Sequence, residues 1–132
     1  MLFEATKTIT LRDADAAGVL FFARYLALAH DVYEEFMASR GIGFRRMLDE
    51  NQYILPIVHA ESDHHQPLWV DDKVTIRMSV LEIGKRKFTV EYLFVTLSGE
   101  TAARCRTTHV AVSKATGRAM ALPEELQRAL TQ

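Results

Sequence analysis

The chain has 132 residues, of which 48% are hydrophobic and 25% charged, so it is long enough for one domain with one hydrophobic core. Its formal net charge of −1 gives no basic field of the kind that favours nucleic acid or an anionic membrane. No apolar run approaches the roughly 20 residues that cross a bilayer, and residues 1–4 do not resemble a signal peptide. The single cysteine, Cys105, excludes an internal disulfide and favours a reducing compartment, so we expect a cytoplasmic protein.

The chain is predicted to begin with a strand over residues 3–11, where apolar side chains alternate with Glu4 and three threonines. A loop over residues 12–20 follows and contains Asp13, Asp15 and Gly18. Aspartates in such loops often cap a turn or a helix, and we expect this structural part for Asp13. Gly18 permits the loop to reverse, which leaves the Asp15 carboxylate facing the N–H groups of residues 21–23 at the start of the next helix.

From Phe22 the apolar side chains take a helical period. They fall on one face, which comprises Phe22, Leu26, Ala29, Tyr33 and Phe36 and is widened by Leu28, Val32 and Met37. A helix with so broad an apolar face is most simply buried by a curved sheet. Gly41 is available for a left-handed cap at its end, and a second, shorter helical turn is predicted over residues 44–50.

The rest of the chain is mostly predicted strand. The expected strands span residues 55–65, 74–80, 88–95 and 101–112, with hairpin turns at 84–86 and 98–100. A short final helix begins after Pro123. Because the later strands are too closely spaced for parallel crossovers, we predict an α+β fold in which an antiparallel sheet wraps one long helix. No repeat or linker interrupts the chain, so residues 1–132 are predicted to form a single domain.

The loop around Asp15 has the parts that thioester hydrolysis requires. A thioester carbonyl is already electrophilic and its thiolate leaves without a strong acid, so the enzyme needs a base or nucleophile and an oxyanion site. Asp15 can serve in either role, and free backbone N–H groups at the helix start can stabilise the oxyanion. The residues do not decide between the two roles.

A cluster of histidines and acids over residues 59–65 is the rival site. On a strand, His59, Glu61, Asp63 and His65 face one way and His64 faces the other. Residues of one extended strand spread too far to surround an ion, so we expect no metal and instead a polar surface or subunit contact. His64 can instead line a ligand pocket. Cys105 has no activating pattern, and no cofactor motif occurs.

The basic turn Lys85-Arg86-Lys87 has two readings, which the residues leave open. Three charges in a hairpin are ordinarily a solvated turn. They also suit a clamp for a phosphorylated ligand, since arginine offers two-pronged contacts and lysine a point charge.

The run from Asp13 to Tyr25, Asp-Ala-Asp-Ala-Ala-Gly-Val-Leu-Phe-Phe-Ala-Arg-Tyr, resembles the signature of hotdog-fold acyl-CoA thioesterases of the 4-hydroxybenzoyl-CoA type. Residues 55–63, 104–110 and 121–123 are similar to the branch that acts on 1,4-dihydroxy-2-naphthoyl-CoA in quinone biosynthesis. The resemblance covers nearly the whole chain. It implies an acyl-CoA thioesterase without a cofactor, with an aromatic acyl group favoured because Phe22 stands where another branch has histidine.

The resemblance also implies roles for particular residues. The catalytic carboxylate is Asp15, the oxyanion donor is the backbone N–H of Phe22, and the hairpin residues Lys85, Arg86 and Lys87 meet the CoA phosphates. It implies a dimer of paired sheets, often doubled to a homotetramer, with sites at subunit interfaces.

Three alternatives stay open. They are hydrolysis of 4-hydroxybenzoyl-CoA or of short or medium-chain aliphatic acyl-CoA, a non-catalytic hotdog module that binds an acyl thioester, and a dehydratase or hydratase that would use His30 or His64.

Overall fold

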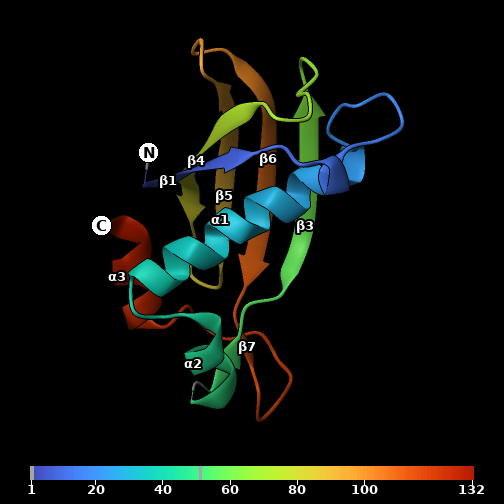
Figure 1. Ribbon diagram of the computed structural model, residues 1–132. Helices are drawn as coiled ribbons and strands as arrows, with labels where there is room; N and C mark the ends of the chain where they lie inside the picture. Colours follow the sequence, from blue (N-terminus) through green and yellow to red (C-terminus); the bar gives the residue numbers. More distant parts are fainter. Residues whose placement is uncertain (1, 51) are drawn as a thin grey trace.

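The computed structural model describes residues 2–50 and 52–132 and consists of one antiparallel sheet with a long helix lying across it (Figure 1). Met1 and Asn51, which belong to the predicted single-domain span, lie outside the described residues. The strands of this sheet are β1 (Phe3–Thr8), β3 (Ile57–His64), β4 (Lys73–Ile83), β5 (Lys87–Thr96) and β6 (Thr101–Val110). Their order is β1-β4-β5-β6-β3, and every described pairing is antiparallel.

Each of the predicted strands is present. β1 ends at Thr8 rather than at Leu11, which begins a 3₁₀ turn with its side chain 77% exposed, and the side chains of β3 are mostly exposed instead of alternating. In β4 and β5 the side chains alternate as expected. Val74, Ile76 and Met78 of β4 are buried, as are Phe88, Val90, Tyr92 and Phe94 of β5. The last strand is shorter than predicted, because β6 ends at Val110 and the chain continues into β7 (Val112–Ser113). β7 pairs with β2 (Tyr53–Ile54) in a small second sheet that the sequence did not indicate.

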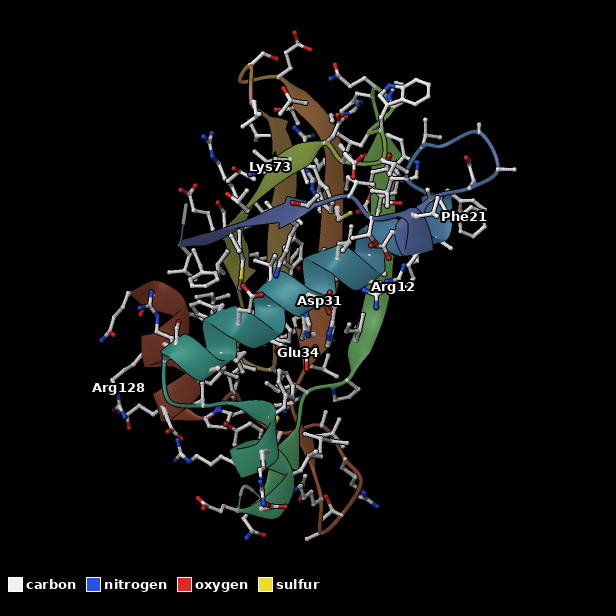
Figure 2. The ribbon with its side chains drawn as sticks, viewed as in Figure 1. Arg12, Phe21, Asp31, Glu34, Lys73 and Arg128 are labelled. Carbon is white, nitrogen blue, oxygen red and sulfur yellow. The ribbon has the colours of Figure 1, made fainter. Side chains whose placement is uncertain are left out.

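The long helix α1 (Tyr25–Ser39) covers one face of the sheet. Its buried residues are Tyr25, Leu28, Ala29, Val32, Tyr33, Phe36 and Met37. Asp31 and Glu34 point away from the sheet on the opposite face of the helix (Figure 2). The strands and the helix therefore bury one shared apolar layer, which the helical period predicted.

Placing Phe22 on that buried face was wrong. Its side chain is 67% exposed, and residues Phe22–Arg24 form a 3₁₀ turn before α1 begins at Tyr25. A 3₁₀ turn has about 3.0 residues per turn rather than 3.6, so Phe22 does not continue the apolar stripe of the α-helix.

Two shorter helices complete the fold at the far end of α1. α2 (Phe44–Asp49) and α3 (Glu124–Thr131) lie where the sequence predicted them, with Pro123 at the N-cap of α3. Arg46 of α2 joins them through an ion pair of 2.7 Å with Glu125. In the described part of the chain, no helix combines the length and apolarity needed to cross a membrane.

Strand β3 forms one edge of the sheet and pairs only with β6 among the described strands. Most of its side chains are exposed, including Ile57 and Val58. The free backbone groups of such an edge are a natural place for pairing with another chain.

Candidate active site

The loop between β1 and α1 closes as a small hairpin with Asp15 near its tip. Ala14 and Leu20 form an antiparallel bridge, and the Asp15 N–H donates to the Val19 carbonyl at 2.8 Å. Gly18 has φ +84°, a conformation that L side chains rarely adopt, and space around it is open. Glycine is therefore required at this position for the backbone turn, as the sequence predicted, rather than for a close approach.

The Asp15 side chain is exposed and is held by its own loop. Its Oδ1 accepts hydrogen bonds from the N–H groups of Ala17, at 2.8 Å, and Val19, at 3.4 Å. The expectation that this carboxylate faces the N–H groups of residues 21–23 differs from these contacts, because an aspartate reaches the N–H two residues onward most easily. These bonds orient one oxygen and leave the side chain accessible to a substrate.

Asp13 has a structural part, as predicted, but through an ion pair with Arg24 and not as the cap of a helix. Its side chain is 3% exposed and accepts a hydrogen bond from Arg24 Nε at 2.8 Å, with Arg24 Nη2 2.7 Å from the same oxygen in an ion pair. Thr10 Oγ1 donates to its second oxygen at 2.9 Å. Sequence reasoning missed Arg24, since 11 positions separate the two charges and only the closed loop brings them together.

The start of the helix offers a free backbone donor. The Phe21 N–H donates to the Asp13 carbonyl at 2.9 Å, and the Arg24 N–H donates to the Phe21 carbonyl at 2.9 Å. The Phe22 N–H, which lies between them, donates to no acceptor within residues 2–50 and 52–132. It belongs to the first turn, where N–H groups have no intrahelical partner. The labelled Phe21 side chain shows where the start of the helix lies in Figure 2.

His64 lies beside the same helix start. Its ring stacks on Tyr25, the first residue of α1, with ring centroids 3.9 Å apart and planes 19° apart. Its Nε2 is 3.0 Å from the Ser62 hydroxyl, on the same face of β3. His59 contacts Glu61 at 3.4 Å, as expected for two residues on the other face of the strand, whereas His65 lies beyond the end of β3. No group of three potential metal ligands occurs among the described residues.

His30, the other histidine considered for an acid–base role, lies further along α1. Its Nδ1 is 3.2 Å from Glu34 of the same helix. This acid is therefore a neighbour on the helix and does not face His30 from across a site. The contact offers nothing specific to a dehydratase or hydratase.

Within one chain, the basic hairpin of residues 85–87 lies far from the loop that carries Asp15. The loop lies beside the turn that precedes β4, where the Val70 N–H donates to the Gly18 carbonyl at 3.0 Å. Lys85, Arg86 and Lys87 follow the other end of β4, whose 11 residues span about 35 Å at roughly 3.3 Å each. Their side chains are exposed, and none pairs with a described acidic residue.

A cavity of about 700 Å³ lies next to the loop, between the turn of residues 66–73 and the β5–β6 hairpin. Trp69 lines it and forms a bridge with Val19 of the loop. None of the predicted site residues lines this cavity.

Comparisons with known proteins agree on one family. A model described as the thioesterase-like superfamily matches residues 9–130. The chain is 33% identical to a 1,4-dihydroxy-2-naphthoyl-CoA hydrolase of Rippkaea orientalis, over 93% of this chain and 91% of that protein. It is 34% identical to the protein of the same name from Synechococcus elongatus, over 95% and 92%. Among solved structures, a 1,4-dihydroxy-2-naphthoyl-CoA thioesterase from Synechocystis matches with a TM-score of 0.92 and 25% identity, over 98% of this chain and 96% of that one.

Proposed function

The chain belongs to the thioesterase-like superfamily, and from this membership we propose that it hydrolyses an aromatic acyl-CoA, 1,4-dihydroxy-2-naphthoyl-CoA, in quinone biosynthesis. The α+β hotdog fold, one antiparallel sheet around one long helix, is the architecture this family membership requires. The single observation that carries the proposal is an accessible carboxylate, Asp15, on a loop that also sets the start of a helix with the free Phe22 N–H.

Asp15 performs the chemical step in this proposal. As a nucleophile, it attacks the thioester carbonyl carbon, the C–S bond breaks, and CoA leaves as a thiolate; water then hydrolyses the resulting anhydride. As a general base, it takes a proton from the water that attacks the same carbon. Both routes give a carboxylic acid and CoA, and both place negative charge on the carbonyl oxygen.

The Phe22 N–H is proposed to stabilise that oxyanion. A fixed backbone donor at a helix start needs no reorganisation when the charge develops, and such a donor typically contributes about 2.7–4 kcal/mol to lowering the barrier. Gly18 maintains the loop conformation from which Asp15 projects.

The proposed substrate contacts extend to His64 and to the basic hairpin. The imidazole of His64 lies beside the helix start, with one nitrogen near Ser62, and can hydrogen-bond a hydroxyl of the aromatic acyl group. Lys85, Arg86 and Lys87 are proposed to bind the CoA phosphates, for which three exposed cations are suited.

A second copy of the chain would bring these residues together. If two β3 edges pair antiparallel about a twofold axis, the hairpin end of one sheet lies next to the loop end of the other. We therefore propose a dimer of paired sheets, doubled to a homotetramer, with the acyl-CoA bound between subunits. A CoA substrate and the single buried thiol Cys105 also fit a cytoplasmic location.

The direct test is the release of free CoA from dihydroxynaphthoyl-, hydroxybenzoyl- and aliphatic CoA esters by the purified protein. We expect the highest kcat/KM for the dihydroxynaphthoyl ester. A higher value for either other class would change the substrate assignment. Tight binding of an ester without any hydrolysis would show that the protein is a binding module and not an enzyme.

A further inference from the structure

The Asp13–Arg24 ion pair is the most enclosed charged contact in the described part of the chain, and the chemistry above does not use it. Arg24 Nε donates to one Asp13 oxygen at 2.8 Å, and Arg24 Nη2 lies 2.7 Å from the same oxygen. The second oxygen accepts from Thr10 Oγ1 at 2.9 Å. Each carboxylate oxygen thus has a hydrogen-bond donor, while the Asp13 side chain is 3% exposed and that of Arg24 is 37% exposed.

The same two residues tie the loop to the helix through the backbone. The Asp13 carbonyl accepts from the Phe21 N–H at 2.9 Å, and the Phe21 carbonyl accepts from the Arg24 N–H at 2.9 Å. Phe22 therefore lies between two anchored residues. Asp15 lies two positions beyond Asp13, and the Ala14–Leu20 bridge connects the two strands of the loop between them.

We infer that Asp13 and Arg24 are positioning residues for thioester hydrolysis, an inference that rests on the proposed function. The pair holds the Asp15 carboxylate and the Phe22 N–H at one separation and orientation, although neither member of the pair touches the substrate. Asp13 belongs to the part of the loop that carries Asp15, and Arg24 belongs to the turn that carries Phe22. Their contact therefore fixes the position of one relative to the other.

The energetics of the pair support a positioning role over a purely stabilising one. The Asp13 carboxylate is removed from water while Arg24 stays 37% exposed, so the cost of burying the carboxylate offsets part of a partly screened attraction. What apolar side chains do not supply is direction, whereas the hydrogen bond from Arg24 Nε, with Nη2 against the same oxygen, fixes where the Asp13 carboxylate lies relative to the guanidinium. A misplacement of about 1 Å caused by a change away from the reacting atoms can cost about 100-fold in rate.

The neighbouring Arg12 provides a matched control. Its Nε is 3.9 Å from the same Asp13 oxygen, but its side chain is 83% exposed. Arg12 therefore also contacts Asp13 but does not fix the position of the loop relative to the helix start. Arg12→Gln removes the same charge as Arg24→Gln, one residue from Asp13, and we expect it to leave kcat unchanged.

The test compares wild-type protein with Arg24→Gln, Arg24→Lys, Arg12→Gln and the double variant Asp13→Asn/Arg24→Gln, which removes both charges together. Arg24→Gln alone leaves a buried carboxylate unpaired, so every variant is assayed at a temperature at which circular dichroism shows it folded. The readouts are kcat and KM for the best CoA ester, and the hydrogen-exchange rates of the amides of residues 14–22.

We expect kcat to fall about 100-fold in Arg24→Gln and in the double variant, with KM within about threefold of wild type and faster exchange over residues 14–22. Arg24→Lys should recover part of the loss. Folded Arg24→Gln and double variants with kcat within about threefold of wild type would overturn the positioning role while leaving the thioesterase intact. Wild-type protein that hydrolyses no thioester would overturn the proposed function and this inference with it.

Discussion

Replacing Phe22 by proline removes one backbone N–H together with an exposed aromatic ring that contacts Phe21. Phe22 is the first residue of the 3₁₀ turn, a position where proline's fixed φ is suitable and its missing N–H breaks no described hydrogen bond. The preceding residue, Phe21, has φ −66° and ψ 137°, which is the backbone region that a residue before proline prefers. The Phe22 ring is 67% exposed, so its loss costs little core packing.

The expected effect of Phe22→Pro is on the chemical step. Losing one oxyanion donor worth about 2.7–4 kcal/mol lowers kcat about 100- to 1,000-fold, while KM and the unfolding midpoint stay near their wild-type values. The measurement is steady-state CoA release, with thermal unfolding monitored in parallel. The control is Phe22→Ala, which removes the ring but keeps the N–H, and should retain most of the activity. Equal activity of the proline and alanine variants would refute the oxyanion role of this N–H.

Two further predictions concern acid stability and nucleotide recognition. Burial, with a contribution from His30, lowers the pKa of His109 from its ordinary value of 6.5 to about 4. The stability of the folded protein that depends on a neutral His109 is therefore present above about pH 6.5 and is lost as pH falls toward 4. Between about pH 7.5 and pH 5 the free energy of unfolding should therefore fall by about 2 kcal/mol more in wild type than in His109→Gln. Urea unfolding of both proteins across this range measures the difference, with exposed His65→Gln as the control. Coinciding pH dependences of wild type and His109→Gln would contradict the prediction. Neutralising Lys85, Arg86 and Lys87 together should raise KM for CoA esters several-fold more than for matched thioesters that lack the nucleotide, and equal effects on both would exclude a phosphate clamp.

The local patterns predicted the elements well because each pattern is set by nearby residues. The alternation in β4 and β5 and the helical stripe of α1 each depend on which side chains face one core. The start of α1 was misplaced because the apolar Phe22 fits the helical stripe by spacing, and the closed loop that forces a 3₁₀ turn is not visible in that spacing.

The candidate site was predicted in its parts but not in its assembly. Asp15 and Gly18 stand out by residue type and order within the loop. Arg24 did not, because its partner Asp13 lies 11 positions away and the pair forms only after the loop folds back. The basic hairpin was found by its charge, yet only the direction of β4 shows that it lies at the opposite end of the sheet from Asp15.

Free CoA release by Asp15→Asn and Asp15→Ala tests the central claim most directly. Both variants lack the carboxylate that serves as nucleophile or base, so kcat should fall at least about 100-fold while circular dichroism shows an unchanged fold. Asp31→Asn, which alters an exposed aspartate on the outer face of α1, is the control and should hydrolyse the ester at the wild-type rate. Near wild-type turnover by both Asp15 variants would contradict the assignment of the reaction to this loop.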